Sequence, residues 1–160
     1  MDDERFIRDG IVHYFDAVAA VLAFEERMKS RLSEVLRRRK LTEGDAKIER
    51  GSAQRWIYIS SRAAFSHNGQ TAYLQCGIGW ALVGKQDNSA RLYACFLCAP
   101  TAEPLPISGS PTAPYEIVNW KKYQLLCRRP SDDPVEDQLA AVIDELRRLS
   151  PEVLALPSGA

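Results

Sequence analysis

Histidine is scarce in this chain. Clusters of polar residues of the kind that most catalytic sites need are scarce as well. Among 160 residues there are two histidines, His13 and His67. Catalysis by serine, cysteine or a metal usually needs a histidine held by a second polar group. His13 lies beside an apolar helical stripe and His67 lies in a turn. We therefore expect neither to be catalytic, and the sequence favours a protein that is not an enzyme.

Net charge and long apolar runs are also missing. The 21 basic residues balance 21 acidic ones, so the chain as a whole does not attract nucleic acid or an anionic membrane. The longest apolar stretch, 11–24, is interrupted by His13 and Asp16 and is too short to cross a bilayer. The start of the chain, residues 1–4, is acidic, the reverse of a secretory signal. These features predict a cytoplasmic protein, and the Arg- and Ala-rich composition favours a bacterial source.

The cysteines do not have the spacing of a metal or redox site. All four lie in apolar segments: Cys76, Cys95, Cys98 and Cys127. Cys95 and Cys98 are three positions apart in a predicted strand, which points their side chains to opposite faces. A structural zinc site instead needs pairs on loops that turn both sulfurs inward. We therefore expect four reduced, buried thiols, with no metal and no cofactor.

Residues 3–40 contain no proline, and their apolar residues recur at helical spacing. The apolar stripe is broad over 7–22, which favours packing on a sheet. After Glu25 it narrows to a seam of four residues: Met28, Leu32, Val35 and Leu36. A helix of this length is about 55 Å long, against about 33 Å for a ten-residue strand. We expect the first half to be core and the second half to overhang the sheet.

Four segments between 55 and 129 have the composition of β-strands. They are 55–65, 71–83, 90–99 and 115–129, and before them 41–54 is interpreted as a connection, with a short strand within it as an alternative. Asn68-Gly69 predicts a tight hairpin between the first two, because a type I′ turn needs two positive φ angles. The third segment is apolar on both faces and is expected at the centre of the sheet. Lys121 and Lys122 favour an edge position for the fourth.

The rest of the chain predicts a loop and a second helix. Residues 100–114 contain five prolines, and so long a connection is either a functional loop or disordered. Asp133 and Glu136 predict a capping box at the start of a helix over 133–149, and 157–160 should fray. The prediction is one α+β domain over 1–160: a long N-terminal helix, a four-stranded antiparallel sheet and a C-terminal amphipathic helix packed on it, in the order α-β-β-β-β-α.

The leading functional prediction is a non-enzymatic protein-binding module, of the inhibitor, immunity- or antitoxin-like, or scaffold kind. It would act through the long helix and the sheet edge, and its partner would be another protein or a second copy of the chain. A homodimer through the N-terminal helix is the expected form, because an apolar seam among charged residues generally marks a contact between helices. The expected contact residues are Met28, Leu32, Val35 and Leu36.

A first alternative is a nucleic-acid-binding or nuclease-related protein. Short basic runs make a nucleic-acid footprint if folding brings them together. The candidate residues are Arg37, Arg38, Arg39, Lys121, Lys122, Arg128 and Arg129. A metal nuclease centre also needs carboxylates on neighbouring strands. The available ones, such as Asp45, Glu49 and Glu116, lie outside the predicted hairpin.

A second alternative is a small-ligand sensor or an enzyme. Gly77 and Gly79 lie two positions apart, so they share one face of a strand. Missing side chains at two such positions leave room for a ligand above the sheet. Tyr73 would form one wall of this pocket, and Trp56 or Tyr58 the other.

Overall fold

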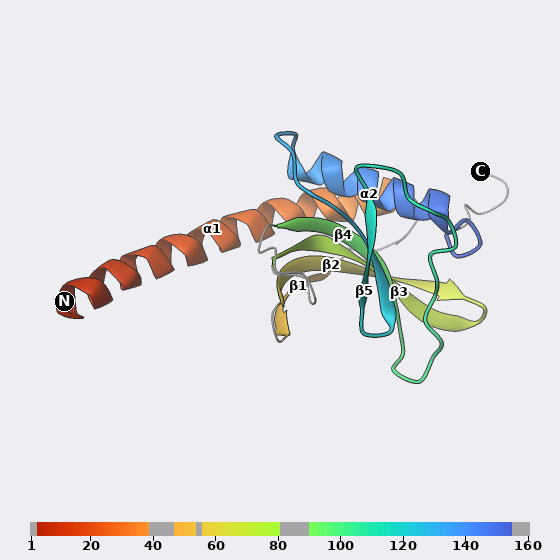
Figure 1. The fold of residues 1–160 in the computed structure, drawn as a ribbon, viewed down its shortest axis with the longest axis horizontal. Coiled ribbons are helices and arrows are strands. Elements are labelled where there is room, and N and C mark those ends of the chain that lie inside the picture. Colours follow the sequence, from red (N-terminus) through yellow and green to blue (C-terminus); the bar gives the residue numbers. More distant parts are fainter. Residues whose placement is uncertain (1–2, 39–46, 54–55, 81–89, 155–160) are drawn as a thin grey trace.

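The chain folds into two helices and one antiparallel sheet. The computed structural model describes residues 3–38, 47–53, 56–80 and 90–154. The elements in chain order are α1 (Asp3–Arg38), β1 (Lys47–Ala53), β2 (Trp56–His67), β3 (Gln70–Trp80), β4 (Arg91–Cys98), β5 (Glu116–Trp120), β6 (Tyr123–Arg128) and α2 (Val135–Leu149). The strand order is β1-β2-β3-β4-β6-β5, and every neighbouring pair is antiparallel. Both helices lie on the same face of the sheet (Figure 1), which confirms the α+β class.

The predicted number of strands, four, is wrong: the sheet has six. β1 lies in the segment interpreted as a connection. The predicted fourth strand, 115–129, is the hairpin β5–β6, in which Trp120 pairs with Tyr123 and Lys121 has a φ of +53°. A lysine is not a usual turn residue, so the sequence does not signal this turn. β5 is at the edge of the sheet and β6 lies inside it.

Two features of the central strands confirm the sequence pattern. Asn68 and Gly69 both have positive φ angles, 50° and 76°, as the predicted hairpin between β2 and β3 requires. β4 pairs with β3 on one side and with β6 on the other, so the strand that is apolar on both faces is central. In addition, the alternate residues Leu74, Cys76 and Ile78 form an apolar row along β3, which is buried in the same core as the apolar face of α2.

α2 packs on the sheet through residues spaced three and four apart. Five of them are buried almost completely: Leu139, Val142, Ile143, Leu146 and Leu149. Each buried aliphatic side chain of this size contributes about 1.5–3 kcal/mol. The helix begins at Val135 rather than at the predicted Asp133, and Pro134 provides no side-chain cap. The expected capping box is therefore not formed.

Gln138 binds the segment that precedes the helix. Its side chain is buried, and its Oε1 accepts a hydrogen bond of 2.8 Å from the backbone N–H of Ser131. Its Nε2 donates to the carbonyl oxygens of Ser131 and Asp133. The carboxylate of Asp133 accepts a hydrogen bond from the Ser131 hydroxyl instead of one from the helix. These bonds fix the segment that enters α2.

The proline-rich segment 100–114 contains no helix or strand, as predicted, but it is held against the domain. Ile107 is buried in the main core, and its backbone N–H donates to Gln124 Oε1 at 3.0 Å. The Ser108 hydroxyl and the backbone N–H of Gly109 both donate to the carbonyl oxygen of Leu149, at the end of α2. The segment is therefore an ordered part of the fold and not a disordered linker.

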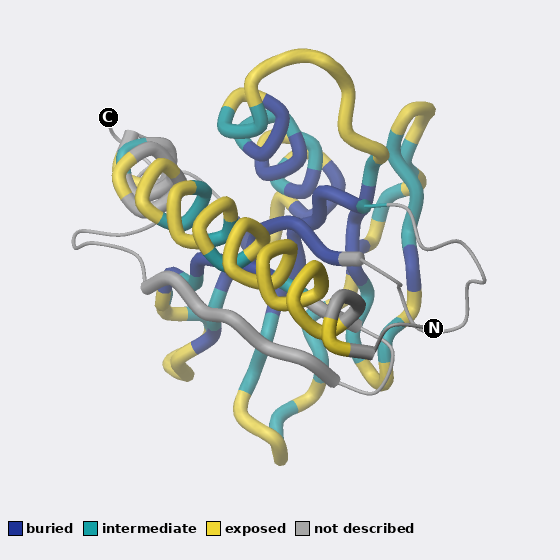
Figure 2. The backbone as a smooth tube through the Cα atoms, turned by 90° about the vertical axis from the view of Figure 1, so that its left-hand side faces the viewer, coloured by how far each residue is buried: buried dark blue, intermediate teal, exposed yellow. Residues whose placement is uncertain are grey.

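The half of α1 that projects is the opposite of the predicted one. The N-terminal half extends away from the sheet, whereas the other end lies beside α2 (Figures 1 and 2). Val21 and Phe24 pack on the core. The residues expected to be core, 7–22, include the large apolar side chains that are most exposed. Because α1 is followed by the sheet, its C-terminal end is the one that the domain holds. Within the described residues no helix is long and apolar enough to span a bilayer.

Candidate functional site

The face of the sheet without helices carries a second, smaller core. Side chains alternate along each strand, so the residues between those that face α2 point to this side. Its buried members are Tyr93, Cys95, Val118, Leu125 and Cys127. The strand register aligns Arg62, Gln75, Cys95 and Leu125 in one row across β2, β3, β4 and β6. The neighbouring row is Ser60, Gly77, Tyr93 and Cys127.

A pocket of about 520 Å³ opens on this face. Four half-buried aromatic side chains stand around it: Tyr58, Tyr73, Trp120 and Tyr123. Its floor is formed by the buried residues Gln75, Tyr93, Cys95 and Leu125. Arg62, Leu97 and the segment 98–100 also line it. A concave site of this volume, mostly apolar with a few convergent polar groups, is typical of small-molecule binding.

A closed set of hydrogen bonds fixes the polar part of the floor. Gln75 Nε2 donates to Ser60 Oγ and to Tyr93 Oη, each at 3.0 Å, and Ser60 also hydrogen-bonds to Tyr93. Both amide hydrogens of Gln75 are thereby used, and the amide oxygen remains as an acceptor. Burial raises the pKa of Tyr93 far above its ordinary value. The phenol is therefore neutral, which disfavours a role as a general base.

Arg62 supplies the positive charge of the pocket. Its guanidinium carbon lies 5.3 Å from the centre of the Tyr73 ring, within the range of a cation–π contact. Burial raises the pKa of the Cys95 thiol far above the usual range, and the nearby Arg62 charge only partly opposes this effect. A neutral thiol is a poor nucleophile. Among the described residues that line the pocket, Arg62 is the only charged one.

The β5–β6 turn and the proline-rich segment form one side of the pocket. The Trp120 and Tyr123 rings lie 6.3 Å apart, and Tyr123 Oη donates to the carbonyl oxygen of Cys98. Lys122 Nζ donates to the carbonyl oxygens of Pro100 and Ala102 at 2.9 and 2.8 Å. These contacts hold the aromatic wall in place.

The pocket lies on the face of the sheet that carries Gly77 and Gly79, but the two glycines do not line it. Tyr58 and Tyr73 do line the pocket, but its floor is the row of Gln75 rather than the two glycines. The side chain of Trp56 lies outside the described part of the structure. Sequence reasoning missed Arg62, Tyr93 and the two aromatics of the β5–β6 turn. The alternation of Tyr73 and Gln75 with the apolar row of β3 is the signal that marks this face.

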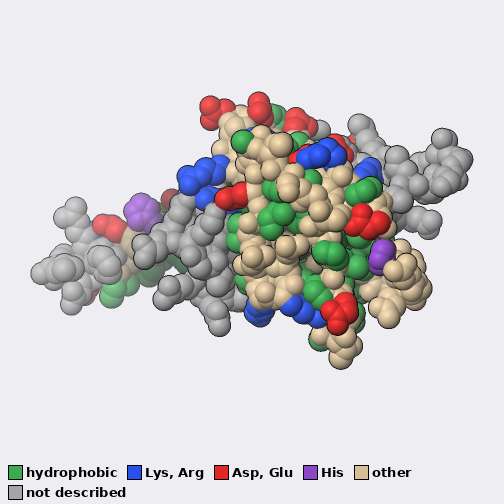
Figure 3. Space-filling model, turned by 45° about the vertical axis from the view of Figure 1, so that its right-hand side comes forward, with side chains coloured by type: hydrophobic (Ala, Val, Ile, Leu, Met, Phe, Trp, Pro, Cys, Tyr) green, Lys and Arg blue, Asp and Glu red, His purple; other side chains and the backbone are tan. Residues whose placement is uncertain are grey.

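The structure separates the predicted nucleic-acid residues. Lys121 and Lys122 lie at the β5–β6 turn, and Arg128 and Arg129 lie at the far end of β6, roughly 20 Å away for a strand of this length. Arg128 lies over the Tyr115 ring. On the face shown in Figure 3, Lys and Arg side chains stand at separate places. The remaining candidates are on α1: Arg37 is exposed, and the Arg38 side chain and Arg39 lie outside the described residues.

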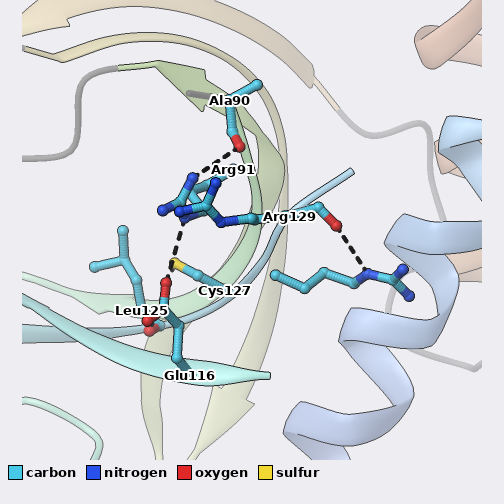
Figure 4. A network of polar contacts seen from close by, with 7 residues as sticks. Ala90, Arg91, Glu116, Leu125, Cys127 and Arg129 are labelled. Atoms are coloured by element: carbon cyan, nitrogen blue, oxygen red, sulfur yellow. Dashed lines mark hydrogen bonds and ion pairs between the residues drawn. The ribbon is translucent and has the colours of Figure 1, made fainter. Parts of the chain in front are cut away.

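The carboxylate considered for a nuclease centre has a structural partner. Arg91 is 3% exposed and donates from Nε to Glu116 Oε1 at 3.3 Å and from Nη1 to the carbonyl oxygen of Ala90 (Figure 4). This ion pair ties the end of β4 to the edge strand β5. In the described part of the chain, no three His, Cys, Asp or Glu side chains are grouped closely enough to hold a metal ion. Asp45 is not described, and neither is the side chain of Glu49.

The second candidate surface is the projecting half of α1. Its large apolar side chains are exposed: Ile7, Ile11, Val12, Tyr14, Phe15 and Leu22. Tyr14 is 65% exposed and Phe15 is 63% exposed, and their rings touch edge to face. The predicted contact residues Met28, Leu32, Val35 and Leu36 have side chains outside the described part of the structure. The apolar surface that is exposed therefore lies on the half of α1 that the sequence predicted to be core.

The histidines lie apart from the pocket. His13 is exposed on α1, and His67 is half-buried at the end of β2, beside Asn68.

No protein-family model, curated protein or solved structure matches this chain.

Proposed function

We propose that this chain is a non-enzymatic protein-binding module that acts through the projecting half of α1, and that the occupant of this surface is α1 of a second copy. The observation that carries the proposal is the exposure of the six large apolar side chains on this half of the helix. Each would contribute about 1.5–3 kcal/mol on full burial. Soluble proteins seldom leave such a continuous apolar strip uncovered unless it is a binding surface.

The spacing of these residues favours another helix as the occupant. Ile7, Ile11, Tyr14 and Val18 follow each other at steps of four, three and four, the spacing of a two-helix seam. Val12, Phe15 and Leu22 widen the strip on its flanks. A helix laid along α1 would cover this strip over several turns.

The charges along α1 favour an antiparallel second copy. Residues 3–26 contain six acidic and two basic residues, and residues 27–38 contain one acidic and five basic residues. In an antiparallel pair that overlaps along 7–22, Asp3 and Glu4 of one helix come level with the region of Arg27 in the other, where the basic section begins, whereas a parallel pair sets like charges together. The zero net charge of the chain adds no general repulsion between copies.

Light scattering coupled to gel filtration tests this proposal. The wild type should have twice the 17.9 kDa mass of the chain. The double variant Ile11→Glu/Phe15→Glu should have the chain mass and still unfold cooperatively, because both side chains are exposed and lie outside the core of the domain. Its unfolding midpoint should not depend on protein concentration, whereas that of the dimeric wild type should. Ala20→Glu is the matched control: Ala20 is exposed on the opposite side of the helix, and its variant should stay dimeric. A monomeric wild type overturns the proposal and points to a foreign partner.

A spin-label distance tests the direction of pairing. A label at Arg8→Cys, in a Cys98→Ser background, reports the separation of the two helix starts. An antiparallel pair places them more than about 20 Å apart, and a parallel pair places them next to each other, since packed helices are about 8–10 Å apart.

We also propose a bacterial cytoplasm as the compartment, because free thiols suit a reducing environment.

A further inference from the structure

We infer that the aromatic pocket on the helix-free face binds a small, flat, uncharged aromatic molecule with an O–H or N–H donor on the edge of its ring. Both helices lie on the other face of the sheet (Figure 1), so this site is independent of the role proposed for α1. The volume, about 520 Å³, lies within the range of about 300–1,000 Å³ found for small-molecule sites. A molecule of two fused rings fits this space.

The walls select a flat aromatic ring. Tyr58 comes from β2, Tyr73 from β3, Trp120 from β5 and Tyr123 from β6, so aromatic surfaces converge on the pocket from four strands. All four side chains are half-buried, and each lines the pocket with part of its surface. Aromatic rings in stacked or edge-to-face contact gain energy beyond the burial of their area. A saturated ring of the same size would gain the burial alone.

Cations of the protein disfavour a positively charged ligand. Three of the four wall rings already have such a cation within about 6 Å, the range of a cation–π contact: Arg62 at Tyr73, Lys121 at Trp120 and Lys122 at Tyr123. A cationic ligand would meet like charge at these rings. The described lining contains no carboxylate that could offset the repulsion.

The pocket does not favour a negatively charged ligand either. Arg62 has a further interaction within the protein besides the contact with Tyr73, so the ligand needs no negative charge to balance it. The floor is neutral, because burial raises the pKa of both Tyr93 and Cys95. Moving a charge from water to such a surface costs far more than moving a neutral ring. An uncharged ligand therefore fits best.

The floor supplies a directed polar contact. Gln75 is buried and donates both amide hydrogens, to Ser60 and to Tyr93, so its amide is held in one orientation. The amide oxygen has two lone pairs, and neither takes part in these two bonds. A hydroxyl or ring N–H of the ligand would donate to this oxygen. A site built for such a donor discriminates against an analogue that lacks it, because the analogue leaves a buried acceptor unpaired.

NMR titration of the wild-type protein with matched two-ring probes tests the inference. Beta-naphthol carries both rings and the hydroxyl, naphthalene lacks the hydroxyl, and decahydro-beta-naphthol keeps the hydroxyl but has no aromatic ring. We expect one saturable site per chain for beta-naphthol, and affinity lower by about tenfold for each of the other two. Equal affinities for beta-naphthol and either analogue, or no binding of beta-naphthol at millimolar concentration, would overturn the inference.

Two charged probes test the preference for a neutral ligand. Beta-naphthoate has a carboxylate in place of the hydroxyl, and beta-naphthylmethylammonium has an ammonium group on the same rings. Both should bind at least about tenfold more weakly than beta-naphthol. If the affinity of either one equals or exceeds that of beta-naphthol, the uncharged class is wrong.

One variant and its control locate the polar contact. In Gln75→Leu the preference for beta-naphthol over naphthalene should fall from about tenfold to about one, because no acceptor is left unpaired by naphthalene. Gln70→Leu is the matched control: Gln70 is exposed, lies on the opposite face of β3 and lines no part of the pocket, so this variant should keep the wild-type preference. A Gln75→Leu protein that keeps the tenfold preference would contradict the assignment.

The wild-type spectrum locates the site without any variant. The side-chain amide resonances of Gln75 and the indole N–H resonance of Trp120 should shift on titration with beta-naphthol, since both side chains line the pocket. Shifts confined to α1 would place the ligand on the other candidate surface and refute the pocket as its site.

Discussion

Gly77 lies so close to Ser60 that a Cβ atom on the glycine would come within 2.7 Å of the Ser60 Cα and 2.1 Å of the Ile59 carbonyl oxygen. The two residues are partners in the β2–β3 register, and both contacts are to backbone, which cannot move aside. The missing side chain therefore allows β2 to approach β3 directly below the pocket.

Replacement of Gly77 by alanine should destabilise the protein strongly. The added methyl group forces the two strands apart, and overpacking of this kind costs about 1–3 kcal/mol or more. Urea unfolding measures the loss. Gly10→Ala is the control, because a Cβ at Gly10 meets nothing within 4 Å and alanine is the better helix former. If Gly77→Ala leaves the free energy of unfolding unchanged, β2 and β3 are less closely packed at Gly77 than described above.

Loss of the Gln138 side chain should cost about 1–3 kcal/mol, because it leaves the backbone groups of Ser131 and Asp133 without their hydrogen-bond partner. The variant is Gln138→Ala, measured by thermal and urea unfolding. Asp137→Asn changes only an exposed charge in the first turn of α2 and should cost less than about 1 kcal/mol. Equal effects of the two substitutions would show that the Gln138 contacts contribute little.

The proline-rich segment should contribute to stability through Ile107. Ile107→Ala removes a side chain that is 7% exposed within the main core, and truncations of this kind cost about 2–5 kcal/mol. The exposed Glu103 in the same segment provides the control, and Glu103→Ala should change the unfolding free energy by less than about 0.5 kcal/mol. If Ile107→Ala is equally neutral, the segment is only a connector.

Thiol reactivity should distinguish Cys98 from the other cysteines. All four are free, and Cys98 is half-buried whereas Cys76, Cys95 and Cys127 are buried. At pH 8 a bulky thiol reagent should modify Cys98 in the native protein and the other three only after unfolding. Mass spectrometry of the labelled peptides identifies the sites. Rapid labelling of Cys95 in the native state would mean that the pocket floor opens easily.

Stability should fall at alkaline pH because of the buried thiols. Burial raises the pKa of Cys76 from 9.0 to about 12. The unfolded chain loses this proton first, so the stabilisation is complete below pH 9 and is lost as the pH rises from 9 towards 12. Urea unfolding between pH 8 and about pH 11 should show a decline that is smaller in Cys76→Ala, since one titrating group contributes at most about 1.4 kcal/mol per pH unit. Parallel declines in both proteins would assign the effect to other groups, such as Tyr93.

Local sequence patterns predicted those elements whose structure depends on near neighbours. Asn68-Gly69 specifies its hairpin because two positive φ angles are cheap only at such residues. The spacing of Leu139, Val142, Ile143 and Leu146 specifies one face of α2. The turn at Lys121 carries no such signal, because the surrounding sheet and not the lysine determines its positive φ. This explains one of the two strands missing from the prediction; the other, β1, lies in the segment interpreted as a connection.

The candidate site depends on the tertiary structure much more than the hairpin and the helix face do. Arg62, Gln75 and Cys95 are 13 and 20 positions apart in sequence, and only the register of β2, β3 and β4 brings them into one row. Trp120 and Tyr123 join them because β6, not β5, pairs with β4. No spacing rule along the chain relates these residues, so a sequence pattern cannot indicate the pocket.

The sequence by itself determined that α1 is a long helix with an apolar stripe and that the sheet is antiparallel, because the periods of 3.6 and 2 are properties of the backbone. Only the tertiary structure decided which half of α1 projects from the domain. Both halves carry apolar side chains at helical spacing, and the choice between them depends on where the helix is attached. Val21 and Phe24, near the middle of α1, pack on the core, and Ile7, Ile11 and Phe15 are exposed on the half that extends beyond the sheet. Burial is a property of the whole fold, and the helical period does not encode it.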